Sequence, residues 1–242
     1  MDMFALGECS EEFLRANLGA RVFALRKPNG KLRPVACGSV LRRLAARTLC
    51  ATFGEDIRRA CGDAQDAVGR KAGCEHLHKA VSALACACPS NVVLKYDCSN
   101  ALNTMPRQLV LDSVQVQALA LVRTASARLC QPTTHLFWEG GGKGRPIRAT
   151  MGVDQGRPLS PALFAIGLAG CLERIQQRLA ALSPACRVFS YLDDVVVVER
   201  SRGEPCKLSF ANFRLPALLL TATRLPLGLP IPRPLCRQRC RA

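Results

Sequence analysis

The spacing of apolar residues along the chain predicts four helices. Apolar side chains recur every three or four positions over residues 40–57, 75–87 and 107–129, a period that gathers them on one face of a helix. Basic side chains lie between them in the first of these segments. The apolar run at 159–172 is too short and too interrupted to cross a membrane, so we expect it to belong to a packed helix over 160–182.

Shorter segments have the features of strands. Residues 91–97 are rich in strand-forming residues and end in a carboxylate. Two further apolar runs flank Asp193 and Asp194, which predicts a tight β-hairpin with both carboxylates at its tip. Residues 134–138 and 147–150 flank a glycine-rich stretch and predict another hairpin. Together these elements indicate an α+β fold, in which helices back an antiparallel sheet.

The adjacent carboxylates at the predicted hairpin tip are the first candidate for chemistry. Like charges side by side repel each other, and hard divalent cations with oxygen ligands are the usual remedy. A solvated Asp-Asp turn is the ordinary alternative. Asp97, at the end of a separate strand, favours a metal site over the solvated turn. Three carboxylates from neighbouring strands suffice for a two-metal phosphoryl-transfer site, in which one ion activates the attacking hydroxyl and the other stabilises the leaving pyrophosphate.

Four blocks of the sequence resemble the motifs of the reverse transcriptases, in the order of that family. They cover residues 25–35, 95–103, 152–161 and 191–194. Each block is weak alone, because a four-residue YxDD string occurs by chance in many proteins. Together they resemble the non-LTR (LINE-type) retrotransposon polymerases. The resemblance implies a right-hand polymerase palm with fingers, and an RNA-directed DNA polymerase.

The resemblance also implies roles for individual residues. Three aspartates would be the catalytic residues and the ligands of Mg²⁺ (or Mn²⁺): Asp97, Asp193 and Asp194. Three cations around a Pro-Asn-Gly turn would hold the triphosphate: Lys27, Lys31 and Arg33. Their position at a hairpin turn suits phosphate binding, although an exposed basic hairpin is the plain alternative. Gln155 and Gly156 would contact the incoming nucleotide and the template, although an ordinary Gly/Pro turn explains them as well.

Two positions depart from the pattern of the family. Five residues after the first palm aspartate, relatives usually have an aromatic ring that blocks a ribose 2′-hydroxyl, whereas this chain has Leu102. Our hypothesis is that discrimination between deoxyribonucleotides and ribonucleotides is loosened, because a branched aliphatic side chain fills less of that space. Arg157 stands where relatives often have an acidic residue, which reverses a charge close to the template path.

Composition describes a basic, globular protein. The chain has 242 residues, 49% of them hydrophobic and 21% charged, so disorder is not expected. The formal net charge of +16 favours a polyanionic partner such as nucleic acid, although a membrane surface could use the same charge. Aromatic residues make up only 5% of the chain, so phosphate contacts rather than base stacking would dominate binding.

The C-terminal part differs from the rest. Residues 200–242 contain nine basic residues, one acidic residue and six of the fifteen prolines, a density that disfavours regular structure. We therefore expect fingers and palm over residues 1–199 and a mostly irregular, basic Pro/Arg-rich tail over 200–242. The later palm motif, primer grip and thumb of the family have no counterpart in the tail, which suggests a truncated or frame-shifted element. A basic arm that holds RNA is the functional alternative.

Fourteen cysteines without a CxxC pair indicate neither a zinc ribbon nor a disulfide framework. One local cluster combines ligand types, but its spacing suits no common zinc module, and buried thiols with exposed histidines explain it better: Cys74, His76, His78, Cys86 and Cys88. Residues 1–20 show no secretory signal. We expect an intracellular protein with reduced thiols and no membrane partner; nucleus and cytoplasm both stay open.

The sequence thus predicts nucleotidyl transfer from a dNTP to the 3′-hydroxyl of a DNA or RNA primer on an RNA template. Two alternatives stay open. In the first, the chain is a catalytically inactive retroelement remnant that only binds RNA or RNA-DNA hybrid through its basic surface. In the second, the fold is kept as a scaffold for interactions. The sequence does not reveal the oligomeric state.

Overall fold

The computed structural model describes residues 9–28, 30–88, 90–98, 100–138, 142–200 and 220–225. The chain divides into two compact units, each built from two segments of the sequence. Unit 1 comprises Met1–Ala60 and Ala101–Gly167, and unit 2 comprises Cys61–Asn100 and Leu168–Ala242. The long helix α9 (Ser160–Leu182) begins in the second segment of unit 1 and continues into unit 2.

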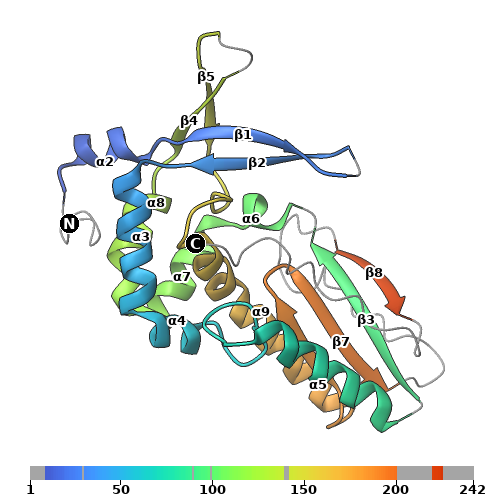
Figure 1. Ribbon diagram of the computed structural model, residues 1–242. Helices are drawn as coiled ribbons and strands as arrows, with labels where there is room; N and C mark the ends of the chain where they lie inside the picture. The colour runs from blue at the N-terminus through green and yellow to red at the C-terminus, as the bar shows by residue number, and fades with distance from the viewer. Residues whose placement is uncertain are drawn as a thin grey trace. The chain divides into compact units, whose positions relative to one another are not determined.

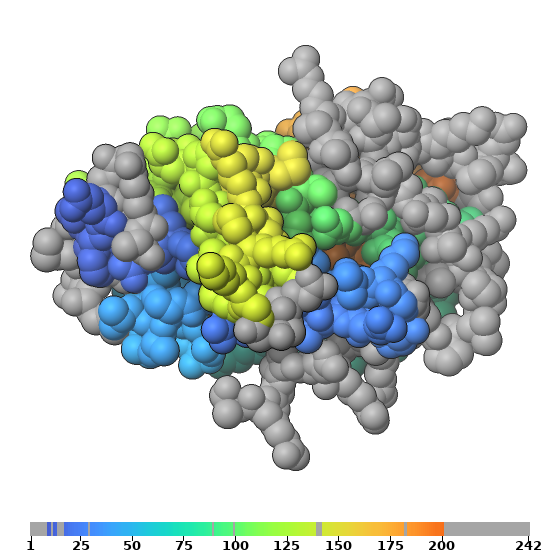
Figure 2. Space-filling view, turned by 90° about the horizontal axis from the view of Figure 1, so that it is seen from above, coloured from blue at the N-terminus to red at the C-terminus, as the bar shows by residue number. Residues whose placement is uncertain are grey.

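Unit 1 contains a four-stranded sheet in the order β2-β1-β4-β5 (Figure 1). Its strands are β1 (Arg21–Arg26), β2 (Leu32–Cys37), β4 (Thr133–Phe137) and β5 (Arg145–Ala149). β1 pairs antiparallel with β2 and parallel with β4, and β4 pairs antiparallel with β5. Figure 2 shows the yellow and yellow-green surface of β4 and β5 beside the blue surface of β1 and β2. Both hairpins predicted for this part of the chain are confirmed.

The helices of unit 1 cover the two segments predicted in this unit, with one interruption in each, and two further helices, at 11–18 and 101–104, were not predicted. They are α2 (Glu11–Leu18), α3 (Val40–Thr52), α4 (Gly54–Ala60), α6 (Ala101–Thr104), α7 (Arg107–Gln117), the 3₁₀ helix η1 (Leu119–Leu121) and α8 (Val122–Leu129). The single helix expected over 40–57 is wrong, because α3 ends before Phe53, whose φ of −106° and ψ of 25° leave the helical region, and α4 begins at Gly54. The segment 107–129 is helical as expected, with a break at Ala118.

Unit 2 contains a second four-stranded sheet, in the order β6-β7-β3-β8 (Figure 1). The strands are β3 (Asn91–Cys98), β6 (Arg187–Tyr191), β7 (Asp194–Arg200) and β8 (Leu220–Leu225), and all neighbours pair antiparallel. β3 and β7 occupy the middle of the sheet, and consecutive residues along both strands are buried. Burial on both faces explains why both read as nearly continuous apolar runs rather than as alternating ones.

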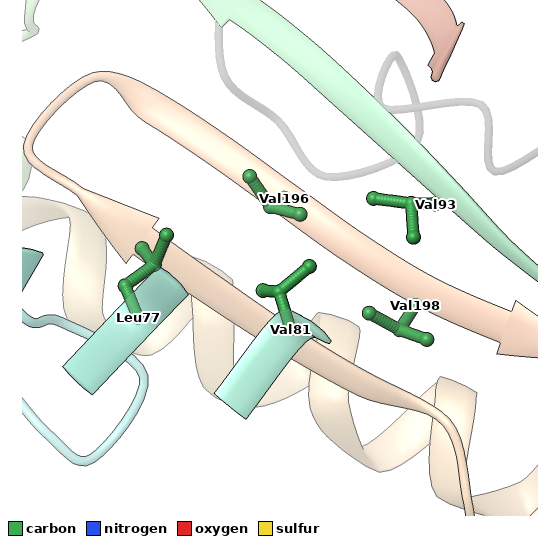
Figure 3. Packing of buried hydrophobic residues seen from close by; sticks show 5 residues of the cluster. All are labelled: Leu77, Val81, Val93, Val196 and Val198. Carbon is green, nitrogen blue, oxygen red and sulfur yellow. The ribbon is translucent and has the colours of Figure 1, made fainter. Parts of the chain in front are cut away.

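The helix α5 (Gly73–Ala87) covers one face of this sheet. Leu77 and Val81 of α5 pack against Val93 of β3 and against Val196 and Val198 of β7 (Figure 3). All five side chains are buried, and burying a side chain of this size contributes roughly 1.5–3 kcal/mol. This core fixes the two central strands relative to each other, and with them the residues at their ends.

The α+β architecture, with an antiparallel sheet backed by helices, is confirmed. The expected irregular tail does not hold for residues 220–225, which form the edge strand β8 against β3. This strand lies in the stretch between Pro216 and Pro226, which contains no proline, so every residue in it can donate to the sheet. The rest of the tail, residues 201–219 and 226–242, lies outside the described residues.

Candidate functional site

Two of the three predicted metal ligands face each other across neighbouring strands of unit 2. The register of β3 and β7 pairs Asp97 with Asp194. Residues directly opposite each other in an antiparallel pair project to the same face, with their Cβ atoms about 4.5–5.5 Å apart. Asp97 is exposed and Asp194 is half-buried, so both carboxylates can reach a solvent-borne ligand.

The third aspartate, Asp193, lies in the turn between β6 and β7. Tyr191 pairs with Asp194, which leaves a two-residue loop of Leu192 and Asp193. Leu192 has a φ of +55°. This left-handed conformation suits glycine, and a bulky residue adopts it only where surrounding contacts hold it there.

All three carboxylates affect a buried thiol at the end of β3. Cys98, which follows Asp97 on β3, is only 5% exposed. Burial, together with the negative charges of Asp193, Asp97 and Asp194, raises the pKa of its thiol to about 12. Asp97 pairs with Asp194, and Asp193 precedes Asp194 in the chain, so the three residues lie at the same end of the unit 2 sheet as Cys98.

A cation of the protein already contacts this cluster. Lys95 lies two residues before Asp97 on β3, and its Nζ is 3.0 Å from Asp194 Oδ1. Within the described ranges, no three His, Cys, Asp or Glu side chains converge closely enough to enclose a metal ion. The donor set nevertheless has the chemistry that a hard divalent cation prefers, since all three groups supply carboxylate oxygens. Lys95 would compete with such a cation for Asp194.

The predicted nucleotide-binding residues all lie in unit 1. Lys27 and Lys31 close the β1–β2 turn, where the Lys27 N–H donates to the Lys31 carbonyl at 2.8 Å. Arg33 follows on β2, opposite Leu25. Lys31 and Arg33 are exposed and Lys27 is half-buried, so this end of the hairpin carries three cations.

The loop that contains Gln155 and Gly156 lies against β2. The Ala36 N–H donates to the Gln155 carbonyl at 2.7 Å. Gly156 has a φ of +108°, and a Cβ at this position would lie only 2.8 Å from Val35 Cγ1 and 3.1 Å from the Ala36 carbonyl oxygen. Glycine is therefore required for two reasons: the backbone conformation and the close approach to β2.

The backbone of Leu102 forms a hydrogen bond with the beginning of the same loop. The Val153 N–H donates to the Leu102 carbonyl at 2.7 Å, and the Gly152 N–H donates to the Met105 carbonyl at 2.9 Å. A Cβ on Gly152 would overlap the backbone of Asn103. The block 152–161 thus contacts both α6, which carries Leu102, and β2, which carries Arg33.

A family model described as "Reverse transcriptase (RNA-dependent DNA polymerase)" matches residues 25–214, most of the chain. The chain belongs to the reverse transcriptase family. A curated relative, the "Retrotransposable element SLACS 132 kDa protein" of Trypanosoma brucei gambiense, is 31% identical over 176 residues, which cover 72% of this chain and 14% of the relative. Together these matches identify a reverse transcriptase of the non-LTR retrotransposon type.

Solved telomerase structures share the fold. The apo telomerase of Candida tropicalis truncated from its C-terminal domain gives a TM-score of 0.63 at 9% identity, covering 87% of this chain and 50% of that one. The telomerase of Candida albicans in complex with a fragment of telomeric RNA gives a TM-score of 0.61 at 11% identity, covering 95% and 46%. The reverse transcriptase chain spans about half the length of these telomerases and far less of the curated relative.

In this reverse transcriptase Arg157 points into the protein. Its side chain is 12% exposed, forms an ion pair with Asp154 and donates to the Leu18 carbonyl at 3.1 Å. His135 Nε2 lies 3.0 Å from Asp154 Oδ1. Burial opposes ionisation of Asp154, but the hydrogen bond to His135 and the charge of Arg157 hold its pKa below the usual range. The arginine that reverses the charge usual in the family therefore serves the packing of unit 1.

Further arginines crowd around this ion pair. Arg42 is buried and donates from Nη1 to the carbonyls of Leu18 and Gly19, at 2.7 and 2.8 Å. Burial, together with the charges of Arg157 and Arg128, lowers the pKa of Arg42 to about 9. Asp154 is the counter-charge that makes this concentration of guanidinium groups tolerable.

Other groups were missed or reassigned. Gln65 and Ser190 hydrogen-bond to the turn that carries Asp193, and sequence periodicity gave no signal for them, because Gln65 lies in a non-periodic loop.

His76, one of the cysteine and histidine cluster, has its Nδ1 2.9 Å from Asp66 Oδ1. The cysteines of the described residues are free thiols. None of the described helices has the length and the apolar character that crossing a membrane demands.

Proposed function

We propose that this chain provides the fingers and palm of an RNA-directed DNA polymerase. It would transfer a nucleotidyl group from a dNTP to a primer 3′-hydroxyl through a two-metal mechanism. The observation that carries the proposal is the register that pairs Asp97 with Asp194, together with Asp193 in the adjoining turn. Carboxylates brought to one place from separate strands could hold a pair of divalent ions.

Divalent metal ions are typical of the family, and we propose Mg²⁺ (or Mn²⁺) for this chain. When bound, such ions lower the pKa of the attacking hydroxyl and stabilise charge on the leaving pyrophosphate. Asp97, Asp193 and Asp194 would hold them. Lys95 would keep Asp194 neutralised in the metal-free protein, since its ammonium group contacts this carboxylate.

The basic end of the β1–β2 hairpin is proposed to hold the triphosphate. Arg33 can bind phosphate oxygens through two parallel hydrogen bonds, whereas Lys27 and Lys31 supply point charges. Gln155 and Gly156 are proposed to line the path of the nucleotide and template. Leu102 is proposed to lie beside the ribose, where its aliphatic side chain would exclude a 2′-hydroxyl less well than a ring.

The proposed partners are an RNA template and a DNA or RNA primer. The net charge of +16 supports a polyanionic partner, and a telomerase of the same fold was solved with a fragment of telomeric RNA. With few aromatic side chains available, contacts to phosphates would provide most of the affinity.

A primer-extension assay tests the proposal. The full chain is incubated with an annealed RNA template and DNA primer, dNTPs and Mg²⁺ or Mn²⁺, and the products are resolved by length. We expect extension by the wild type and a loss of at least about 1000-fold in Asp193→Asn, because one of the three carboxylates that would hold the ions loses its charge. The matched control is Asp63→Asn, a change at an exposed aspartate of unit 2, which should extend primers like the wild type.

One observation favours a second candidate, a remnant that binds RNA without catalysis. Asp194 already has a cationic partner in Lys95, whose Nζ lies 3.0 Å from Asp194 Oδ1. This candidate predicts tight, salt-dependent binding of RNA-DNA hybrid in a filter-binding assay together with no extension by the wild type under either metal. Extension that disappears in Asp193→Asn excludes it.

A further inference from the structure

A buried glutamine lies next to the turn that presents the aspartates of unit 2. Gln65 is 0% exposed and belongs to the loop that precedes α5. Its Oε1 accepts hydrogen bonds from the Leu192 N–H at 2.9 Å and from the Ala67 N–H at 3.1 Å. Its Nε2 donates to Ser190 Oγ at 3.1 Å. The side-chain amide therefore forms hydrogen bonds through both its oxygen and its nitrogen, and two of these three bonds go to the β6–β7 hairpin.

Ser190 completes a ring of hydrogen bonds around Leu192. Its Oγ accepts from Gln65 and donates to the Leu192 carbonyl at 2.7 Å. Both backbone polar groups of Leu192 are thus held by this pair of side chains. Leu192 is the residue with a φ of +55°, and Asp193 follows it directly.

The backbone of the loop is fixed to β6 as well. The Ser190 N–H donates to the Ala64 carbonyl at 2.6 Å, and the Asp66 N–H donates to the Ser190 carbonyl at 2.8 Å. These bonds form a parallel bridge between Gln65 and Ser190. The ring therefore connects two segments that are already aligned.

The loop is anchored at its other side to charged groups. Asp66 is buried, and its Oδ1 lies 2.7 Å from Arg70 Nε and 2.9 Å from His76 Nδ1. His76 belongs to α5, which packs on the sheet. Gln65 is thus held in place by groups outside the hairpin, so it can impose a conformation on Leu192 rather than follow it.

We infer that Gln65 and Ser190 are positioning residues that hold Leu192 in its left-handed conformation and thereby aim Asp193 and Asp194. A leucine at positive φ relaxes when its supporting contacts are removed, and the residue that follows it then changes direction. A buried glutamine that only satisfied the core would not concentrate its bonds on the hairpin. The catalytic part of this inference rests on the proposed polymerase activity; the conformational part does not.

Hydrogen exchange of the full chain tests the conformational part. The amide of Leu192 is followed in wild type, Gln65→Met and Ser190→Ala, with Gln177→Met as the matched change at an exposed glutamine of unit 2. We expect exchange at Leu192 to be about tenfold faster in Gln65→Met, the effect of losing a hydrogen bond of ordinary strength, and unchanged in Gln177→Met. Ser190→Ala keeps the bond to the Leu192 N–H but loses the ring, and should give a smaller increase.

Steady-state primer extension tests the catalytic part. In Gln65→Met we expect kcat to fall by about 100-fold, the effect of a displacement near 1 Å at a reacting centre, while KM for the dNTP stays within about twofold. Gln65→Glu should regain activity relative to wild type as the pH falls, because a protonated carboxyl group can both donate and accept as the amide does. A role in stability alone predicts that kcat follows the folded fraction of each variant, whereas the positioning role lowers kcat in fully folded protein.

The outcomes separate the inference from the proposed function. Unchanged exchange at Leu192 in both Gln65→Met and Ser190→Ala overturns the inference, whatever the activity. Faster exchange with unchanged kcat overturns the positioning role and leaves the polymerase proposal intact. A wild type that does not extend primers overturns the polymerase proposal, and the exchange measurement still decides whether Gln65 holds the turn.

Discussion

At the scale of single residues, the side chain of Leu102 is expected to set the choice between dNTPs and rNTPs. Its backbone is fixed by the hydrogen bond from Val153, so a change of side chain should leave the position of α6 unaltered. We predict that Leu102→Phe raises the preference for dNTPs over rNTPs, measured as the ratio of kcat/KM values, by about tenfold, which corresponds to about 1.4 kcal/mol. An equal or lower preference in the phenylalanine variant would refute the hypothesis.

Asp154 is expected to stabilise the folded protein through its buried ion pair with Arg157. Removing one partner of a buried ion pair destabilises a protein by about 3–5 kcal/mol, so Asp154→Asn should lower the free energy of unfolding by that amount at pH 7 in urea titrations. Asp112→Asn, a change at an exposed residue of α7, should alter it by less than about 0.5 kcal/mol.

The pH dependence of this effect follows from the pKa of Asp154. Because the folded protein holds that pKa below its ordinary value of 3.8, the unfolded chain binds the proton more readily. The contribution of Asp154 is therefore fully present above pH 3.8 and is lost as the pH falls through the lowered value. Wild type and Asp154→Asn should converge in stability only in that acidic range. A difference that stays constant down to the lowest accessible pH would contradict this account.

At the scale of elements, the contact between the 152–161 block and β2 requires Gly156. We predict that Gly156→Ala destabilises the protein in urea titrations more than Gly62→Ala does, by at least about 1 kcal/mol. Both glycines have a positive φ, but a Cβ on Gly62 would meet nothing within 4 Å, whereas one on Gly156 would meet Val35 and Ala36. Equal effects of the two substitutions would show that only the backbone conformation matters.

Elements were the part of the structure that sequence patterns predicted best. The apolar runs of β3 and β7 and the helix over 160–182 were read correctly, since their periodicity or composition is unambiguous. The break at Phe53 was missed because the apolar spacing continues across it. β8 was missed because the proline content of the whole tail hid a stretch of nine residues without proline.

At the scale of the whole molecule, the net charge of +16 predicts how nucleic acid binds. We expect the affinity for single-stranded RNA to fall linearly with salt on logarithmic axes, with a slope of about −0.7 for each phosphate contacted. Fluorescence anisotropy between 50 and 300 mM KCl measures this slope. Binding that does not respond to salt, or no binding at all, would favour the scaffold alternative.

Residues of the candidate site could be predicted from the sequence only where they belong to a recognisable motif. Asp97, Asp193 and Asp194 are visible in the sequence as carboxylates at the ends of strand-like runs, and the β3–β7 register pairs two of them. Gln65 and the inward turn of Arg157 could not be predicted, because both depend on contacts between segments far apart in the sequence. Local patterns specify elements, whereas such contacts arise only from the folded arrangement.

The most direct test of the account is metal binding by the three carboxylates. Isothermal titration of the full chain with Mn²⁺ should show a saturable site in the wild type, weakened at least about tenfold in each of Asp97→Asn, Asp193→Asn and Asp194→Asn, because each removes a charged oxygen ligand. Asp63→Asn should bind like the wild type. If Asp97→Asn binds Mn²⁺ as tightly as the wild type, residue 97 does not share a metal site with residues 193 and 194, and the polymerase proposal is wrong.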